Sequence, residues 1–417
     1  MSNPASTPNW ANRTIWTGDN LPIMRGMNSE SVDLIYLDPP FNSKSNYAAP
    51  ISSEATGAEF KDTWALNDID EAWVNLIEQK HRALHRVLLA AQTKSDKSYL
   101  IYMAARLLEM RRLLKPTGSI YLHCDLTMSH YLKLVMDAIW GRKLFRNEIV
   151  WCYDTAGRTR KFWNKKHDVI LMYIQSKDYL FNSVKVPRRN LEEGWESWYR
   201  KIDKDGRRYQ IDGKGYKYYA DEGRLPNDWW DDIRALHANR DKERLGYPTQ
   251  KPLKLLQRII KASSNEGDLV LDPFCGCATA PVAAEQLGRR WVGIDISPKA
   301  AELVQYRLNK DEIGTLLHKA VRREDIPQRT DLGKLPKYNC KENKQFLYGK
   351  QEGYCAGCIP PERFAMHNLE VDHIVSRAEG GTDHLGNLQL LCGRCNRVKG
   401  KRGMEYLRAK LQMDSSA

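Results

Sequence analysis

The sequence lacks any apolar run of the length that a membrane-spanning helix requires. Such a helix needs roughly 18–20 consecutive apolar residues, and none occurs among the 417 residues. The opening residues, MSNPASTPNW, also lack the charged and then apolar pattern of a secretory signal. We therefore expect a soluble cytoplasmic protein with no membrane partner.

Acidic residues are in the minority as well. The chain has 65 Lys and Arg against 52 Asp and Glu, a net charge of +13. A basic balance favours a polyanionic partner such as nucleic acid, although composition alone identifies none. Hydrophobic residues make up 42% of the chain, enough for a sizeable core, and the length fits roughly two or three domains.

Nine cysteines are present, and four of them form two close pairs. Cys355 and Cys358 make one pair, and Cys392 and Cys395 make the other. Inside a cell, such pairs indicate metal ligands more often than disulfides. Two pairs supply four thiolates to one tetrahedral ion, which predicts a structural Zn²⁺ site. Four unligated thiols are the alternative, and Cys340 is a weaker fifth candidate.

Short apolar runs alternate with helical patterns, which is typical of a parallel sheet covered by helices. The sequence thus predicts an α/β, doubly wound fold. The runs predicted as strands are 32–37, 119–123, 169–174, 268–271 and 291–294. The predicted helices are 71–114, 252–263, 281–287 and 298–310, with a turn at Lys115-Pro116-Thr117-Gly118.

The alternation is lost between about 180 and 245. Basic residues are interleaved there with aromatic ones, namely Trp195, Trp198, Tyr199, Tyr209, Tyr216, Tyr218, Tyr219, Trp229 and Trp230. Cations can neutralise phosphates and aromatic rings can stack on bases, so this stretch is a candidate for nucleic-acid recognition. A solvated insertion with a small aromatic core is the alternative. A second poorly patterned stretch, 321–345, is predicted to be a linker.

One strand, glycine turn, helix and second strand make a βαβ unit that begins at Asp272 and ends at Asp295. Gly276 would let the backbone approach a ligand closely, and an acid about 20 residues further on binds ribose hydroxyls in this fold. The pattern alone does not separate S-adenosylmethionine from a dinucleotide, nor either of them from an unrelated α/β protein.

Several segments resemble motifs of DNA amino-methyltransferases. Residues 272–279 (DPFCGCAT) are similar to their S-adenosylmethionine loop, DPFxGxGT, and 247–252 (YPTQKP) to the segment before it. Ala278 departs from the pattern, because the second glycine usually stands there. Asp38-Pro39-Pro40-Phe41 resembles the catalytic loop, and 42–47 (NSKSNY) continues it. The resemblance implies the cofactor-binding residues Asp19, Asn20, Thr249, Lys251, Asp272, Phe274, Gly276, Thr279 and Asp295.

The catalytic loop precedes the cofactor loop, an order similar to the beta class of these enzymes, whose target-recognition region lies between the two. The chemistry accounts for the residue types. An exocyclic base amine is a poor nucleophile, so Asp38 and a proline carbonyl would accept its hydrogens and free its lone pair. Pro39 and Pro40 would fix that carbonyl, and Phe41 would stack on a base flipped out of double-stranded DNA. Asp38 favours adenine N6, while cytosine N4 stays open.

The C-terminal segments EVDHIV (370–375), GGTD (380–383) and NLQLLC (387–392), followed by NRVKG (396–400), resemble an HNH endonuclease domain of ββα-metal fold. The family implies that His373 is the general base. Asp372 and Asn396 would bind Mg²⁺ or a similar divalent ion, and Asn387 would hold the loop that orients His373.

We therefore expect a methyltransferase domain at 1–320, the linker, and a small zinc-stapled HNH domain at 346–417. The leading hypothesis is a bifunctional enzyme that methylates adenine N6 at specific sites and also hydrolyses DNA, as in restriction–modification. One alternative is a methyltransferase whose HNH module only binds DNA. A non-enzymatic DNA-binding protein and an RNA substrate are further alternatives. The sequence leaves the oligomeric state open, a homodimer included.

Overall fold

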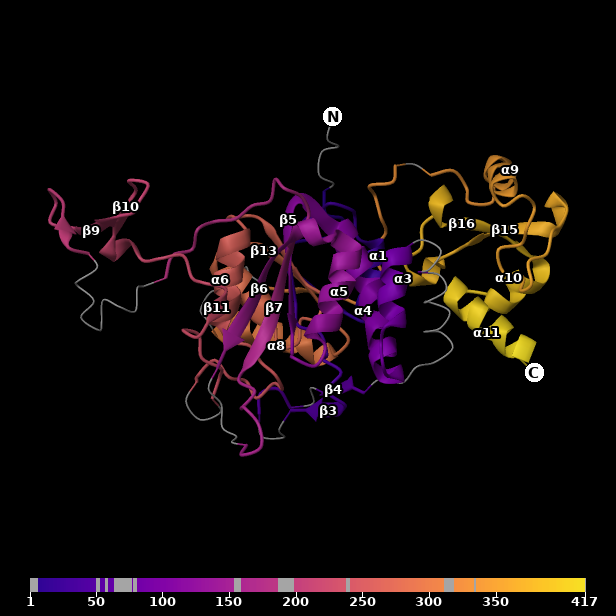
Figure 1. The fold of residues 1–417 in the computed structure, drawn as a ribbon. Helices are drawn as coiled ribbons and strands as arrows, with labels where there is room; N and C mark the ends of the chain where they lie inside the picture. Colours follow the sequence, from indigo (N-terminus) through magenta and orange to yellow (C-terminus); the bar gives the residue numbers. More distant parts are fainter. Residues whose placement is uncertain are drawn as a thin grey trace.

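The structure, a computed structural model, describes residues 7–49, 53–56, 59–63, 77, 81–153, 159–186, 199–237, 241–310, 319–333 and 335–416. A nine-stranded sheet lies at its centre, with helices on both faces (Figure 1). In spatial order its strands are β11 (Trp229–Trp230), β6 (Phe145–Cys152), β7 (His167–Ile174), β5 (Leu114–Cys124), β2 (Val32–Leu37), β12 (Leu269–Asp272), β13 (Arg290–Asp295), β1 (Thr14–Thr17) and β14 (Val321–Arg323).

Neighbouring strands of this sheet run parallel, except that β7 is antiparallel to both β5 and β6. Strand β2 is apolar at almost every position because helices cover both faces of the sheet. Leu34 and Tyr36 point into one core, whereas Ile35 and Leu37 point into the other. The α/β prediction with a mostly parallel sheet is therefore confirmed.

Each face of the sheet carries its own group of helices. One core contains side chains of α1 (Asn20–Gly26), α3 (Arg82–Leu89), α4 (Lys94–Leu113) and α5 (Ser129–Trp140). The other contains side chains of α6 (Leu253–Ser263), α7 (Thr279–Gln286) and α8 (Pro298–Lys310). Among the described residues, no helix is long and apolar enough to cross a bilayer.

The helix predicted at 71–114 is wrong as a single element. Residues 64–76 and 78–80 lie outside the described part, and the remainder forms α3 and α4. Thr93 begins α4 by accepting a hydrogen bond from the amide of Asp96 at 3.0 Å. The turn predicted at 115–118 is also wrong, because these residues belong to β5. They bulge out where the register with β2 shifts, so Pro116 interrupts no regular ladder.

The aromatic stretch forms a small sheet of its own. Its antiparallel strands are β8 (Lys201–Ile202), β9 (Arg208–Ile211) and β10 (Lys217–Tyr219), and Figure 1 shows β9 and β10 well away from the central sheet. Trp230 and Tyr199 are buried, whereas Tyr216 is exposed. Trp195 and Trp198 lie outside the described residues. A further hairpin, β3 (Ser45–Ala48) with β4 (Glu59–Asp62), follows the predicted catalytic loop.

The segment predicted as a linker contains regular structure at both ends. It begins with β14, which pairs with β1, and it includes the first residues of α9 (Lys341–Lys350). Between them, the Asp331 carboxylate accepts a hydrogen bond from the Ser29 amide at 2.9 Å.

The C-terminal part has a core separate from the two that flank the large sheet. Strands β15 (Leu369–His373) and β16 (Leu388–Cys392) form an antiparallel pair, followed by α10 (Gly393–Lys399) and α11 (Met404–Ser416). This is a ββα arrangement, drawn in yellow in Figure 1. Short 3₁₀ helices complete the fold at Arg142–Leu144, Ala220–Glu222, Met366–Asn368, Arg377–Glu379 and Leu385–Asn387.

Candidate active sites

A cavity of about 700 Å³ opens at the ends of β2, β12 and β13. Ends of parallel strands are the usual place for a ligand in an open α/β sheet. The four residues of the predicted catalytic loop line it together with all nine predicted cofactor residues, which are Asp19, Asn20, Thr249, Lys251, Asp272, Phe274, Gly276, Thr279 and Asp295. The fold thus brings together segments that are more than 200 positions apart.

Asp38 immediately follows β2, and its two carboxylate oxygens differ in their contacts. Its Oδ2 accepts a hydrogen bond from the Lys251 ammonium at 2.7 Å, and Lys251 is 7% exposed. Its Oδ1 is buried and has no hydrogen-bond partner within the described part of the chain. A buried polar atom normally has a partner, so this oxygen is an acceptor available to a ligand.

The backbone after Asp38 is fixed by a residue that the sequence argument did not select. Asp62, on β4, accepts hydrogen bonds from the amides of Phe41, Asn42 and Ser43 at 3.2, 2.7 and 2.8 Å. Asn42 is in the left-handed region at φ 59°, and its side chain donates to Asp96 at 2.8 Å. Because one carboxylate accepts hydrogen bonds from three consecutive amides, the loop after Asp38 is rigid. A rigid loop can hold a backbone carbonyl of the proline pair in a fixed position.

Phe41 forms the aromatic side of the cavity. Its ring stacks on His123 with centroids 6.1 Å apart, and His123 bridges Tyr36 and Asp168, each at 3.0 Å. Burial alone would raise the pKa of Asp168, but the hydrogen bond from His123 and the charge of Lys251 lower it below its usual value. The network links the cavity to the start of β7.

The opposite wall is the glycine turn between β12 and α7. Gly276 has φ 50°, and its amide donates to Asp295 at 2.7 Å. Burial raises the pKa of Asp295, and it raises that of Asp272 well above its usual value. Ala278 has φ 64°, in the left-handed region where glycine is favoured. Ala278, which stands where the family pattern has glycine, therefore has a strained backbone conformation.

Asp19 and Asn20 close the cavity at the start of α1. Asp19 accepts from the Leu21 amide at 3.0 Å and so caps the helix, while Asn20 donates to the Pro273 carbonyl at 2.7 Å. Arg106, which sequence reasoning missed, binds both side chains at 2.7 and 2.6 Å. No local motif marks this arginine, which reaches the cavity from the middle of α4.

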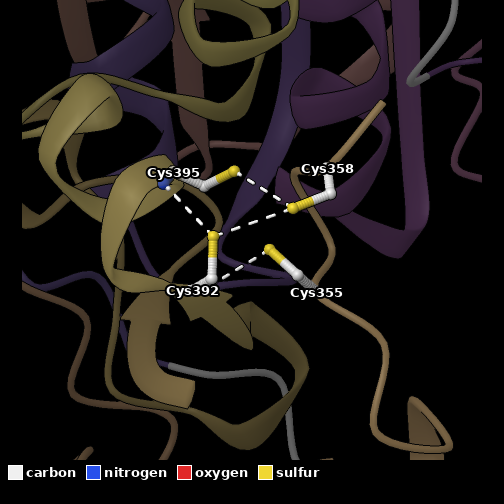
Figure 2. Close-up of side chains that lie close together, drawn as sticks. All are labelled: Cys355, Cys358, Cys392 and Cys395. Carbon is white, nitrogen blue, oxygen red and sulfur yellow. Dashed lines mark hydrogen bonds between the residues drawn. The ribbon is translucent and has the colours of Figure 1, made fainter. Parts of the chain in front are cut away.

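The four paired cysteines lie together in the C-terminal part, as Figure 2 shows. Their sulfurs all lie within 4.8 Å of one another, and the Cys358 sulfur is 3.7 Å from those of Cys392 and Cys395. Four ligands at the usual Zn–S distance of about 2.3 Å stand about 3.8 Å apart in a tetrahedron. The cluster fits a zinc ion, and Cys340 lies outside it.

His373 ends β15 and is 8% exposed. Its Nε2 lies 2.9 Å from Asp383, and the ring of Tyr338 is 4.7 Å away. The Asn387 side chain bonds the backbone of Val375 and Thr382 at 2.9–3.0 Å, so it fastens the loop that follows His373. Asp383, ten positions after the histidine, is a third residue to which sequence reasoning gave no role.

Asp372 and Asn396, the predicted ligands of a divalent ion, already have protein partners. Asp372 forms an ion pair at 2.9 Å with Lys399, which is fully buried. The Asn396 amide donates to Glu370. Lys399 and, at 3.4 Å, Gln389 both contact Oδ2 of Asp372, so a cation bound here would lie beside a buried ammonium.

Two folds are thus joined in one chain: an α/β domain with a ligand cavity beside an Asp-Pro-Pro-Phe loop, and a ββα domain with a cysteine cluster. The sequence profile of the DNA methylase family matches residues 32–306, and that of the HNH endonucleases matches 355–402. The chain belongs to the N6/N4 DNA methylase family and carries a C-terminal HNH domain.

Curated relatives are similar over the same region. The DNA adenine methyltransferase YhdJ of Escherichia coli is 29% identical over 303 residues, covering 71% of this chain and 83% of YhdJ. The type II methyltransferase M.HpaI of Haemophilus parainfluenzae is 27% identical, covering 69% and 71%. Among solved structures, the cytosine-N4-specific PvuII DNA methyltransferase matches with a TM-score of 0.44 and 13% identity, over 75% of this chain and 94% of that one.

Proposed function

We propose that the α/β domain transfers a methyl group from S-adenosylmethionine to adenine N6 in double-stranded DNA. The observation that carries this proposal is the Asp38 carboxylate. Lys251 holds one of its oxygens, and the other is buried at the cavity without a partner. An exocyclic amine would supply the missing hydrogen bond.

The cavity residues divide into two groups. The carboxylates of Asp272 and Asp295, with the Gly276 turn, form the wall suited to the adenosine part of the cofactor. Asp19, Asn20, Thr249, Phe274 and Thr279 complete that wall. Lys251 lines the cavity too, but its ammonium contacts Asp38. We assign it to the catalytic loop more than to the cofactor.

The target base would enter against Phe41. There the amine would donate one hydrogen to Asp38 Oδ1 and another to a carbonyl of the proline pair, which makes the nitrogen lone pair available. The bound cofactor supplies a methyl group already activated on a sulfonium. As the nitrogen–carbon bond forms and the sulfur–carbon bond breaks, the amine proton leaves through Asp38. Positioning supplies much of the rate in such a reaction.

Adenine is favoured over cytosine by the aspartate that begins the Asp-Pro-Pro-Phe loop. The name of YhdJ, a DNA adenine methyltransferase, supports the same choice. The test is to incubate unmethylated plasmid with the protein and labelled S-adenosylmethionine, digest the DNA to nucleosides and analyse them by mass spectrometry. N6-methyl-2′-deoxyadenosine is expected, whereas N4-methyl-2′-deoxycytidine as the sole product would refute adenine specificity.

We further propose that the HNH domain hydrolyses DNA with Mg²⁺ or a similar ion held by Asp372 and Asn396. The support is His373, which Asp383 orients and which Asn387 positions through the following loop. A neutral imidazole can take a proton from water near pH 7. In a restriction–modification arrangement, methylation would protect the sites that this domain would otherwise cut.

The second candidate is an HNH domain that binds DNA without cutting it. The ion pair between Asp372 and Lys399 favours it, because a buried ammonium occupies the place of a cation. Plasmid incubated with Mg²⁺ and either the protein or its His373→Ala variant separates the two. Cleavage by the parent alone would establish the nuclease, and weaker cleavage of premethylated plasmid would support protection. Plasmid that stayed intact under every condition would favour the HNH domain that binds DNA without cutting it.

A further inference from the structure

The most exposed aromatic pair of the described chain belongs to neither proposed site. Phe162 is 64% exposed and Trp163 is 95% exposed. They lie in the loop between β6 and β7, within residues 159–166 (TRKFWNKK), which we term the FW loop. Burying an aromatic ring is favourable by roughly 1.5–3 kcal/mol, so an indole held in water indicates a surface that acts on a partner.

The charge around this pair specifies the kind of partner. Arg160 and Lys161 precede the two aromatics, and Lys165 and Lys166 follow them, with no acidic residue between 159 and 166. Cations on both sides of an exposed ring suit a chain of phosphates with stacked bases between them. A hydrophobic protein surface would not need four cations in eight residues.

Two hydrogen bonds within the FW loop stabilise its turn. The Thr159 amide donates to the Asn164 side chain at 3.0 Å, and the Lys161 amide donates to the Thr159 hydroxyl at 3.2 Å. Phe162 and Trp163 therefore stand at the tip of a short closed turn. A wedge that enters a base stack must resist being pushed back, and this bracing provides that resistance.

The sheet places the loop beside the catalytic carboxylate. Since β7 alone is antiparallel, it begins at the edge where β5 and β2 end, and Asp38 follows the last residue of β2. Three neighbouring strands span about 10 Å. At the root of the loop, Trp151 packs edge-on against His123 at 5.8 Å, the residue that stacks on Phe41.

We propose that Trp163, supported by Phe162, is a wedge that enters the DNA base stack beside the target nucleotide and occupies the space left by the flipped base. The cations of the FW loop hold the phosphates on either side. An extruded base leaves a gap whose refilling opposes flipping, and an inserted ring blocks that return. The inference rests on methyl transfer in the adjacent cavity.

The test compares Trp163→Ala with the parent on two duplexes, after sequencing of methylated plasmid has located the target. In one duplex the target base is paired, and in the other it faces an abasic position and needs little help to leave the stack. Phe346→Ala, which removes another exposed aromatic (56%) on α9, outside the α/β domain, is the matched control, and Trp163→Phe is the conservative variant.

Trp163→Ala should slow methylation of the paired duplex about ten-fold or more, within the range of one lost stacking contact. On the abasic duplex its rate should return to within about three-fold of the parent, and Trp163→Phe should be intermediate. An equal loss of methylation rate on both duplexes, or no loss on either, would overturn the proposal that Trp163 is a wedge. Parent protein that left the plasmid unmethylated in the first step would overturn the proposed methyl transfer itself, which keeps the two failures distinct.

Discussion

The two domains share one arrangement, a lysine against a carboxylate, with different consequences. In each, a lysine that is buried or nearly so contacts the carboxylate predicted to act: Lys251 on Asp38, and Lys399 on Asp372. In the methyltransferase cavity one carboxylate oxygen stays free for a neutral amine. In the HNH domain, Lys399 and Gln389 both contact Oδ2 of Asp372, so a divalent ion at this carboxylate would lie beside a buried ammonium. We expect that ammonium to oppose binding of the ion, whereas the Asp38 site accepts a neutral donor.

The largest expected effect is on folding. We expect the HNH domain to need Zn²⁺ to fold, and the α/β domain to fold without it. Structural Zn²⁺ contributes about 10–16 kcal/mol to small domains, while the α/β domain depends on two apolar cores. Cys395→Ala should lose zinc and unfold the HNH domain, leaving a protease-resistant methyltransferase part. Metal analysis and limited proteolysis measure both. Cys340→Ala, outside the cluster, is the control, and a protease-resistant HNH domain without metal would contradict the zinc assignment.

Lys399→Met tests the proposed competition at the nuclease site. Breaking a buried ion pair costs about 3–5 kcal/mol, so the HNH domain should melt at lower temperature. Asp372 would be released at the same time, and Mn²⁺ should bind at least several-fold tighter in a titration followed by electron paramagnetic resonance. Unchanged or weaker Mn²⁺ binding in the folded variant would show that Lys399 does not occupy the cation's place.

Lys251→Met is the counterpart in the methyltransferase cavity. Asp38 would lose its fixed oxygen and its neighbouring charge, so methyl transfer should fall about 10- to 100-fold. Binding of S-adenosylmethionine should change little, because the Lys251 ammonium contacts Asp38. Calorimetry and single-turnover kinetics separate the two quantities. If binding fell and the transfer rate did not, Lys251 would belong to the cofactor wall after all.

The smallest expected effect is at Ala278. A non-glycine residue in the left-handed region costs about 1–2 kcal/mol, but the buried methyl group returns about 0.8 kcal/mol. Ala278→Gly should therefore stabilise the α/β domain by less than about 1 kcal/mol in a denaturant titration. Ala280→Gly, buried inside α7, should instead destabilise it by about 1–2 kcal/mol, because the penalty of glycine in a helix adds to the loss of a buried methyl group. Destabilisation of the α/β domain by Ala278→Gly would show that the turn is not strained.

Short-range patterns accounted for five strands of the nine-stranded sheet, the Asp-Pro-Pro-Phe loop, the glycine turn and the cysteine pairs. Each is specified by neighbours in sequence, and the predicted cofactor residues all line one cavity. What sequence reasoning missed is long-range pairing. Asp62 binds the amides of a loop 19–21 positions away, and Arg106 meets Asn20 across 86. Neither residue belongs to a motif, so only the fold identifies them.

The β6–β7 loop also shows that sequence patterns alone do not reveal where a segment lies in the fold. Recognition was predicted in the aromatic stretch at 180–245, but part of that stretch packs internally, as Trp230 and Tyr199 do. The exposed Phe162 and Trp163 lie earlier in the chain. Two aromatics between basic pairs were visible in the sequence. Only the reversed direction of β7 shows that their loop leads into the sheet edge where β2 ends at Asp38.

The central claim is that Asp38 activates the base amine through its free oxygen. The most direct measurement is single-turnover methyl transfer to plasmid DNA by Asp38→Asn, with S-adenosylmethionine binding measured on the same sample. The account predicts cofactor binding close to that of the parent and a transfer rate reduced by about 10²-fold or more. A transfer rate within a few-fold of the parent, with the cofactor bound, would contradict it.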